Sequence, residues 1–367
     1  MKNLAELQAE CATLGIKVET TGRASKEPYI AALRDYHWRK DHPDQPLPAQ
    51  IMPMLLGSWE DLDEAEADEI EADGSGWLLQ QKMDGVRALL HVERDGVRIT
   101  SRTVSEVNYR LSEFQANVSH LAEKFENLVG TVLDGELICP AAEIDTGATR
   151  TQNALQATMA ILATTPTNAL KIQTDQNVRL LFHGFDILKL QGADTTQQPL
   201  LNRLDLLHQA VRIAQNPHVV ELPGHVIGKS RIHESLLATG AEGSVWKKLD
   251  GCYLPGQRVR HWVKRKRGLA VTAFVSNFKL GSPDRGNCDH IGALEFSCRN
   301  DDDTSTPIGW VSSWTDAERR AMTTIDDAGR VGLNPDYRQK KAIITGQDLS
   351  ARSRRLRHAR LVCWVDA

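Results

Sequence analysis

The stretch WLLQQKMDGVRALLHVERDGVRITSRT, residues 77–103, decides the fold of this 367-residue chain. Apolar and polar residues alternate on both sides of Asp95-Gly96, a dipeptide typical of two-residue hairpin turns. The stretch therefore predicts one strand over 77–83 and a hairpin over 87–103. The string Lys82-Met83-Asp84-Gly85-Val86-Arg87 joins the two, so its side chains are expected at the end of a strand.

Strand-like and helical patterns continue along the rest of the chain. Further strands are expected at 128–138, 178–188, 242–248 and 260–266, and helices at 152–163 and 201–213. Residues 50–266 are therefore expected to form an α+β domain built largely on antiparallel sheet. Residues 267–367 contain short strand-like runs separated by turn residues, which predict a small β-barrel.

Residues 1–41 predict a pair of helices, followed by a proline-containing linker over 42–49. The apolar positions that indicate the helices are Leu4, Leu7, Cys11 and Leu14 in the first, and Ile30, Leu33 and His37 in the second, with Ser25 as its cap. With Gly22, Arg23 and Lys26 in the turn, the pattern resembles SAP-type helix-hairpin modules, which bind DNA. The alternative is a plain helical hairpin packed on the main body.

Charge is distributed unevenly along the chain. The sequence has 44 Lys and Arg against 48 Asp and Glu, a formal net charge of −4. Residues 59–73 carry nine of these acids and no base, and without them the balance becomes +5. Basic residues cluster at 258–267 and 340–360, as is typical of a protein that binds nucleic acid. The acidic run is expected to be a solvated helix away from DNA, since its carboxylates would repel phosphates.

Composition argues against several classes of protein. No apolar run approaches the roughly 20 residues that a membrane-spanning helix needs, and the polar N-terminus has no signal-peptide pattern. The six cysteines include no CxxC pair, which argues against a zinc ribbon and against a disulfide framework. The sequence therefore predicts a cytoplasmic protein in a reducing compartment.

Residues suited to phosphate chemistry recur downstream of Lys82. They are Ser101-Arg102, Asp134-Gly135-Glu136-Leu137, Phe185-Asp186-Ile187-Leu188, Glu242-Gly243-Ser244-Val245-Trp246-Lys247 and Trp262-Val263-Lys264-Arg265-Lys266. Strand residues two apart share a face, so Lys264 and Lys266 are expected to project together towards an anion. Lys82 must lose its proton to act as a nucleophile, and neighbouring cations, a metal and partial desolvation favour the neutral amine. Each motif alone also has a plain reading, as a tight turn, a core phenylalanine, a surface carboxylate or a basic edge strand.

In this order the motifs resemble those of the covalent nucleotidyltransferases, the family of polynucleotide ligases and capping enzymes. Over residues 46–366 the chain is most similar to compact bacteriophage-type ATP-dependent DNA ligases. The resemblance implies an adenylation (nucleotidyltransferase) domain of ATP-grasp-like antiparallel sheets over 50–266 and an OB-fold barrel over 267–367. It implies that Lys82 attacks the α-phosphate of ATP and carries AMP as a phosphoramidate. The AMP then passes to the 5′-phosphate of a nick, and the 3′-hydroxyl displaces it.

The same resemblance implies roles around the nucleotide. Gln80 would face the adenine edge, a position where relatives often have Glu. Phe185 would stack on the adenine, with core packing as the alternative. Glu242 and Glu136 would hold Mg²⁺, and Glu136 would also meet the ribose hydroxyls. Lys247 would face away from Glu242 if both belonged to one regular strand.

Further nucleotide contacts are implied for residues near the nucleophile and for several cationic side chains. They are Gln81, Met83, Arg87, Arg102, Lys247, Lys264, Lys266 and Arg357, with Arg354 and Arg360 as alternatives to Arg357. The implied partner is nicked double-stranded DNA, bound by a monomer that uses ATP and Mg²⁺ and does not associate with a membrane.

Three other functions are weighed against this one. An RNA ligase and a GTP-dependent capping enzyme are the alternatives within the enzyme class. A non-catalytic DNA-binding protein is the alternative from another class, although the complete set of candidate catalytic residues argues against it. An NAD⁺-dependent ligase is disfavoured because the chain is far shorter than that family and lacks its cysteine-pair zinc motifs.

Overall fold

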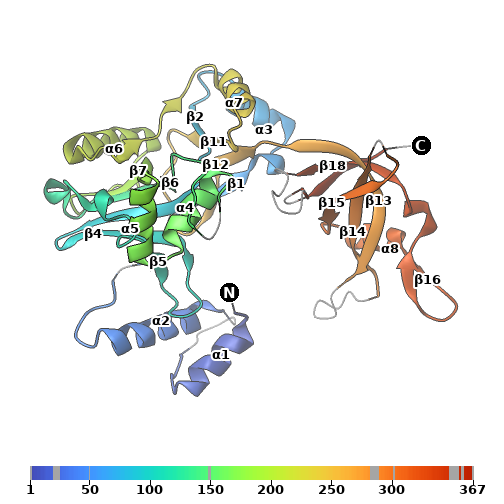
Figure 1. Ribbon diagram of the computed structural model, residues 1–367, viewed down its shortest axis with the longest axis horizontal. Helices are drawn as coiled ribbons and strands as arrows, with labels where there is room; N and C mark the ends of the chain where they lie inside the picture. Colours follow the sequence, from blue (N-terminus) through green and yellow to red (C-terminus); the bar gives the residue numbers. More distant parts are fainter. Residues whose placement is uncertain are drawn as a thin grey trace. The chain divides into compact units, whose positions relative to one another are not determined.

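The computed structural model describes residues 2–19, 25–48, 50–147, 150–281, 289–300, 302–346, 355–356 and 359–365. The chain divides into two compact units, Met1–Arg265 and Lys266–Ala367 (Figure 1). Across the described ranges, no helix is both long enough and apolar enough to cross a membrane.

Two sheets form the centre of the first unit. The first sheet has the strand order β1 (Leu55–Ser58), β12 (Arg258–Lys266), β11 (Gly243–Lys248), β2 (Trp77–Gln81) and β10 (Gly224–His225). The second sheet has the order β5 (Leu111–Glu113), β4 (Gly96–Val104), β3 (Val86–Glu93), β6 (Val132–Ile138), β7 (Leu181–Leu190) and β8 (Ala193–Asp194), with β9 (Val219–Glu221) beside β7. Most pairs are antiparallel, as predicted, while β1–β12 and β7–β9 are parallel.

The predicted hairpin is the pair β3–β4, with Asp95-Gly96 at its turn. Along β3, Ala88 and Leu90 belong to one apolar cluster and Leu89 belongs to another. Because successive strand residues point to opposite faces, the second sheet is covered on both sides.

Helices cover the outer face of each sheet. Three helices pack on the second sheet: α4 (Ala154–Leu162), α5 (Pro166–Asp175) and α6 (Leu200–Ala214). On the first sheet, α3 (Glu64–Glu71) and α7 (Lys229–Ala238) place Ile70, Ile232 and Leu236 against Leu79 and Trp246. The inner faces meet in a cluster that includes Leu78, Leu89, Phe185, Tyr253 and Trp262. The layers therefore run helix, sheet, sheet, helix.

The predicted N-terminal helix pair is confirmed as α1 (Leu4–Thr13) and α2 (Glu27–Asp41). Asn3 caps α1 by accepting from the N–H of Glu6, whose side chain accepts in return from the N–H of Asn3. The pair packs against the connection between β4 and β5 (Figure 1). The buried residues of this contact are Leu7, Cys11, Ile30, Leu33 and Tyr109. The predicted turn residues Gly22 and Arg23 lie outside the described residues.

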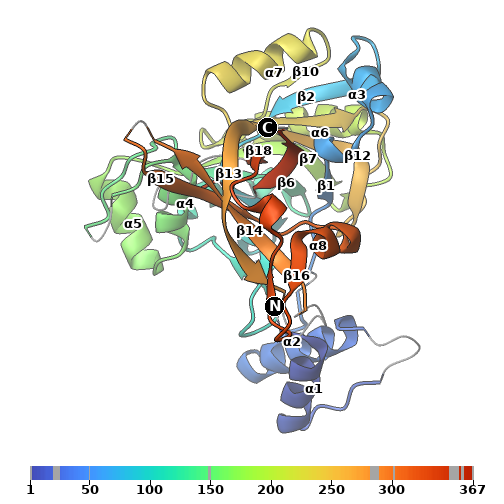
Figure 2. The same cartoon turned by 90° about the vertical axis from the view of Figure 1, so that its right-hand side faces the viewer.

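The second unit is built on one sheet with the order β15 (Ser305–Val311), β14 (Ile291–Arg299), β13 (Leu269–Leu280), β18 (Lys341–Gly346) and β19 (Arg360–Trp364). It also contains α8 (Asp316–Met322), beside β14 in Figure 2, and a hairpin of β16 (Thr323–Ile325) and β17 (Val331–Leu333). Short 3-10 helices complete both units: η1 (Trp59–Asp61), η2 (Ser119–Ala122), η3 (Glu126–Leu128) and η5 (Pro335–Tyr337).

The expected closed barrel is not found among the described residues of this unit, because the sheet stays open between β15 and β19. Among the described residues, a hydrogen bond of 2.5 Å from the N–H of Leu356 to the carbonyl of Ile308 links Leu356 to β15. Pro307, in the middle of β15, has no N–H to donate, which suits an edge strand and hinders a continuous ladder.

Candidate active site

Lys82 follows directly on β2, in the tight connection to β3. Its backbone N–H donates to the carbonyl of Gly243 at 2.9 Å, which extends the pairing of β2 with β11 by one residue. The connection passes close to β6, because a Cβ on Gly85 would lie 2.2 Å from the carbonyl oxygen of Leu137. Glycine is therefore required there, and the predicted position of Lys82 at a strand end is confirmed.

Glu242 forms an ion pair with Lys82, with 2.5 Å between Oε2 and Nζ. Glu242 lies just before β11, in which Ser244 is paired with Gln81 of β2. The pairing of the two strands thus joins side chains 160 residues apart in sequence. Both side chains are largely buried, with exposed fractions of 19% and 22%. At this distance the carboxylate of Glu242 can accept a proton from the amine of Lys82.

Arg87 binds Asp134 in a two-point contact across β3 and β6. Nε and Nη2 donate to the two carboxylate oxygens at 3.0 and 2.6 Å. Asp134 is fully buried, and charge-assisted pairs of this geometry are among the strong hydrogen bonds of proteins. Burial disfavours the charge on Arg87, but the carboxylate of Asp134 outweighs it, so the pKa of Arg87 lies above its usual value.

Glu136 stands opposite Arg87 in the ladder between β3 and β6. Burial raises the pKa of Glu136 to about 7, although the positive charges of Lys82 and Arg87 oppose this shift. The carboxylate of Glu242 adds to it by repulsion. Lys82, Arg87, Glu136 and Glu242, which the sequence assigned to one site, are therefore electrostatically coupled.

Phe185 and Trp262 form an aromatic pair between the two sheets, with ring centroids 6.1 Å apart. The ammonium of Lys247 lies 4.3 Å from the ring centroid of Phe185 and 3.8 Å from that of Trp262. It donates to the carbonyl of Phe185 at 3.2 Å. Burial lowers the pKa of Lys247 to about 7. Phe185 is thus a core residue that also belongs to the candidate site, where the guanidinium of Arg87 is 5.2 Å from its ring centroid.

The expectation that Lys247 faces away from Glu242 applied only if both residues shared one regular strand, and they do not. Glu242 precedes β11, which begins at Gly243, so strand alternation does not relate the two side chains. Gly243 has a φ of 149°, a conformation open to glycine, and the chain turns there.

Gln80 is buried in β2, two residues before Lys82. Its amide nitrogen donates to the carbonyl of Leu222 at 2.9 Å. Its amide oxygen is buried and has no hydrogen-bond partner in the part of the chain that the structure describes. Such a group is costly unless a ligand supplies a donor. Of its predicted neighbours, Gln81 ends β2, and Met83 packs against the cluster between the sheets.

Lys264 and Lys266 occupy alternate positions at the end of β12, where Lys264 is paired with Ser58 of β1. Arg265, between them, forms an ion pair with Glu71 of α3. Arg260 of the same strand binds Glu66 of α3 at 2.8 Å.

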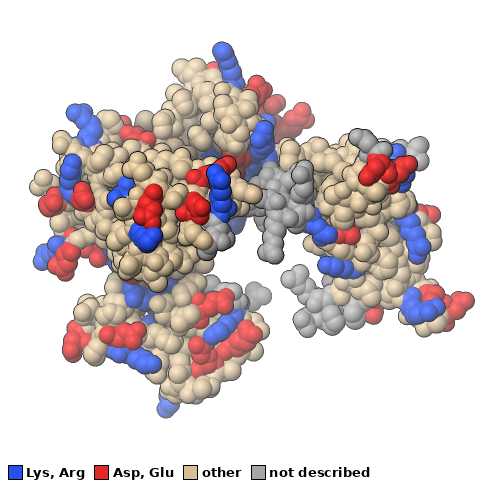
Figure 3. Space-filling view, in the orientation of Figure 1, with Lys and Arg blue, Asp and Glu red and all other residues tan. Residues whose placement is uncertain are grey.

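The acidic run therefore forms the predicted helix, α3, but it is not simply solvated. Acidic side chains gather over α3 in Figure 3, and two of them neutralise arginines of β12. The sequence did not predict this contact, because the run and the strand are far apart in the chain.

The remaining predicted cationic residues are Arg102, Arg354, Arg357 and Arg360. Arg102 is exposed on β4, and Arg360 begins β19 in the second unit. Arg357 and Arg354 lie outside the described residues. Within the described ranges, no group of three or more His, Cys, Asp or Glu side chains forms a metal site made of protein alone. Mg²⁺ commonly uses one or two carboxylates with substrate phosphates, so Glu242 and Glu136 suit it.

Sequence reasoning missed Tyr253, and it placed Trp262 in a motif without giving it a role. The hydroxyl of Tyr253 donates to Asp134 at 2.6 Å, and Trp262 flanks Lys247. Trp262 is two residues from Lys264 on β12, so strand alternation offered a signal for it. Tyr253 lies in a connection without periodicity, and no local pattern pointed to it.

The sequence of this chain is similar to those of known proteins. Residues 53–266 match the family model described as the ATP dependent DNA ligase domain. A probable DNA ligase of Saccharopolyspora erythraea is 31% identical over 258 residues, which cover 70% of this chain and 45% of the relative. One from Pseudarthrobacter chlorophenolicus is 29% identical over 251 residues, covering 67% and 44%. The chain thus spans under half the length of these relatives.

Solved structures share the fold at low sequence identity. A protein described as Pmar-Lig_PreS3 has a TM-score of 0.59 and 18% identity, covering 93% of this chain and 72% of its own. A Lig E DNA ligase has a TM-score of 0.55 and 16% identity, covering 87% of this chain and all of its own. The family model spans more than half of the sequence and includes Lys82, Arg87, Glu136 and Glu242. The chain therefore belongs to the ATP-dependent DNA ligase domain family.

Proposed function

We propose that the protein is an ATP-dependent DNA ligase that seals nicks in duplex DNA. In the first step, Nζ of Lys82 attacks the α-phosphorus of ATP, pyrophosphate leaves, and the amine loses a proton. The AMP then moves from Lys82 to the 5′-phosphate at the nick. Finally the 3′-hydroxyl attacks that phosphate, AMP leaves, and a phosphodiester forms. These steps fit a role in DNA repair, replication or recombination.

One observation carries this proposal, the 2.5 Å contact between the amine of Lys82 and the carboxylate of Glu242. A nucleophilic lysine needs an acceptor for its proton, and Glu242 is within reach. Glu136, whose pKa burial raises to about 7, provides a second carboxyl group in the same cluster. Glu242 and Glu136 would hold Mg²⁺, which supplies neutralisation of the phosphate charge.

Adenine fits the base site better than guanine does. The buried amide oxygen of Gln80 needs a donor, and the exocyclic amine of adenine is one. The corresponding group of guanine is a carbonyl, which would place two acceptors together. Phe185, at the aromatic pair, is proposed to stack on the base. Arg87, Arg102, Lys247, Lys264 and Lys266 are proposed to contact the sugar or phosphates, together with Arg357.

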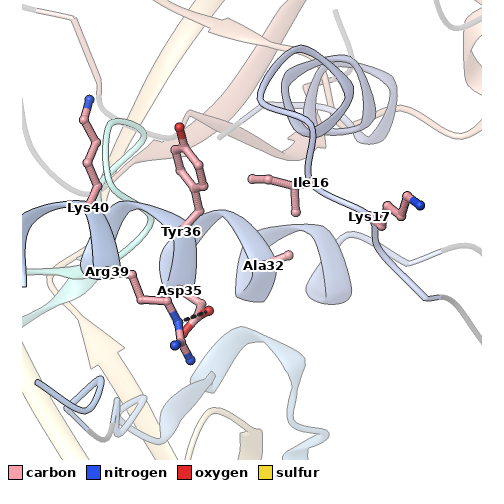
Figure 4. Close-up of a pocket in the computed structure, with 7 residues that line it drawn as sticks. All are labelled: Ile16, Lys17, Ala32, Asp35, Tyr36, Arg39 and Lys40. Carbon is pink, nitrogen blue, oxygen red and sulfur yellow. Dashed lines mark hydrogen bonds and ion pairs between the residues drawn. The ribbon is translucent and has the colours of Figure 1, made fainter. Parts of the chain in front are cut away.

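The N-terminal helix pair is proposed to contact DNA. A groove of about 580 Å³ runs beside α2, and Figure 4 shows Lys40, Tyr36 and Ile16 along it. Lys17 adds a second positive charge, whereas Arg39 is paired with Asp35 at 2.7 Å. Residues 1–41 would form this module, 42–49 a linker, 50–266 the adenylation domain and 267–367 an OB-type domain. The protein would act as a monomer in the cytoplasm.

The decisive experiment incubates the protein with Mg²⁺ and α-labelled ATP or GTP and examines it on a denaturing gel. We expect label from ATP on the wild type and no label on Lys82→Ala. Lys171→Ala is the matched control, because Lys171 also pairs with a carboxylate at 2.5 Å, on the exposed surface of α5. It should be labelled like the wild type.

The other outcomes separate the alternatives. Label from GTP alone would indicate a capping enzyme. Label from ATP followed by sealing of nicked RNA but not nicked DNA would indicate an RNA ligase. Absence of label with either nucleotide would contradict the enzyme assignment and leave a DNA-binding protein.

A further inference from the structure

Tyr253 lies in the connection between β11 and β12 and is fully buried. Its hydroxyl donates to Oδ2 of Asp134 at 2.6 Å and accepts from the backbone N–H of Met54 at 3.0 Å. Asp134 is 119 residues earlier in the chain, on β6 of the other sheet. The phenol therefore links the first sheet's connection to the second sheet's central strands.

Among the described residues, the carboxylate of Asp134 accepts hydrogen bonds from Arg87 and Tyr253, which share Oδ2. Arg87 takes both oxygens in its two-point contact, while Tyr253 binds Oδ2 alone. Asp134 is completely buried, so its orientation depends on these donors rather than on water. The guanidinium of Arg87 is held in turn, because a two-point pair fixes the plane of both groups.

The connection that carries Tyr253 is itself firmly held. The N–H of Tyr253 donates to the carbonyl of Thr196 at 2.8 Å. Two residues earlier, the carbonyl of Gly251 accepts from Arg203 at 2.9 Å. Arg203 is fully buried and binds both oxygens of Asp186, next to Phe185, at 2.7 and 2.8 Å. These contacts therefore position the phenol, and they also fix β7, the strand that carries Phe185 of the aromatic pair.

We propose that Tyr253 is a positioning residue for nucleotide transfer, acting through Asp134 to set the orientation of Arg87. This inference rests on the proposed function, in which Arg87 contacts the nucleotide near Lys82. Without the phenol, Asp134 keeps its charge pair but loses the second donor that fixes its rotation. Arg87 then presents its remaining N–H groups at a less defined angle, and a misplaced contact slows the chemical step.

The experiment is a double-mutant cycle on the rate of protein–AMP formation at saturating ATP, measured by rapid quench. We expect Tyr253→Phe to slow this rate about tenfold in the wild-type background. In the Arg87→Ala background the same change should have no further effect on the rate. A merely structural role predicts the same factor in both backgrounds, and that result, or an unchanged rate in Tyr253→Phe, would overturn the proposal.

Two further variants keep the result interpretable. Tyr109→Phe is the matched control, since Tyr109 is also buried and donates to a carboxylate, Glu10, away from Lys82. It should leave the rate unchanged. If Tyr253→Phe does not yield folded protein, Asp134→Asn replaces it and should likewise add nothing in the Arg87→Ala background. Additive effects there would count against the proposal. Failure of the wild type to form protein–AMP would instead contradict the proposed function.

Discussion

Two buried tyrosines of the first unit make the same kind of contact in different surroundings. Tyr253 donates to Asp134, which is paired with Arg87. Tyr109 donates to Glu10, which is paired with Lys2 at 2.8 Å. In the first case the carboxylate and the guanidinium side chains have exposed fractions of 0% and 9%. In the second, the carboxylate and the ammonium side chains have 24% and 36%.

This difference in exposure distinguishes the buried network of Tyr253 from the network of Tyr109, which attaches the N-terminal helix pair. The Tyr253 network lies between two sheets, where its charges have no water to replace a lost partner. The Tyr109 network fastens a helix pair of about 40 residues to the connection between β4 and β5, and water can reach its charges. A phenol, a carboxylate and a cation therefore form part of the candidate site in one place and a docking contact in the other.

The largest expected difference follows from removing the carboxylates. Asp134→Ala leaves Arg87 and the phenol of Tyr253 buried without their acceptor, at a cost of about 3–5 kcal/mol in the free energy of unfolding. It should also abolish protein–AMP formation. Glu10→Ala should cost clearly less and leave the reaction intact. Urea unfolding followed by circular dichroism measures both, and equal losses of stability would remove the distinction between the two networks.

The stability of the protein is expected to depend on pH through Glu136. Burial raises the pKa of Glu136 to about 7 in the folded protein. In the unfolded chain the same carboxyl group ionises near pH 4.5. The stability from the neutral carboxyl is present below pH 4.5 and is lost as the pH rises through about 7. As the pH rises from 4 to 8, the free energy of unfolding of Glu136→Gln should therefore increase relative to that of the wild type, by about 3 kcal/mol at most.

Glu10 has the opposite dependence. Burial alone would raise its pKa, but hydrogen bonds from Lys2 and Tyr109 outweigh burial and lower it. The stability that ionised Glu10 contributes is present above pH 4.5 and is lost as the pH falls below that value. Glu10→Gln should therefore be less stable than the wild type above pH 4.5, and this difference should disappear in acid. Thermal melts from pH 3 to 8 test both variants. A Glu136→Gln curve parallel to the wild type would contradict the burial of an uncharged carboxyl.

The smallest expected effect concerns the N-terminal helix pair. Reversing the charge of the two lysines that line the groove, Lys17→Glu with Lys40→Glu, should weaken binding to nicked duplex DNA roughly threefold to tenfold without affecting protein–AMP formation. The double variant Lys124→Glu with Lys171→Glu is the control of equal charge change, on exposed lysines away from the groove. Fluorescence anisotropy at fixed salt measures the dissociation constants. Equal losses in both variants would reduce the helix pair to a structural role.

Much of the fold was predictable because local chemistry specifies it. Strand alternation and the Asp95-Gly96 turn gave the β3–β4 hairpin, and helical periodicity gave α4 and α6. Three helices, α5, α7 and α8, were missed, the first two for different reasons. α5 begins with available signals, a Thr165 cap and Pro166 in the first turn. α7 follows Gly228 in a left-handed conformation and has no side-chain cap, so the sequence carried no signal for its start.

The candidate site was predictable only as a set of residues. The motifs named Lys82, Arg87, Glu136 and Glu242, and the structure couples them. Their partners were not predictable, because alternation assigns a side chain to a face but not to what that face meets. Tyr253 reaches Asp134 only once two sheets pack together. The open sheet of the second unit has the same origin, since closure depends on how distant strands meet.

The acidic helix α3 changes how the basic strand β12 would meet DNA. Arg260 and Arg265 already hold the carboxylates of Glu66 and Glu71, so neither guanidinium recruits a mobile anion. A phosphate that bound such an arginine would first have to displace the carboxylate of Glu66 or Glu71. The displaced carboxylate would attract a cation from solution, which offsets the cation that the DNA releases. The binding constant should therefore fall less steeply with salt than the number of arginines on this strand suggests.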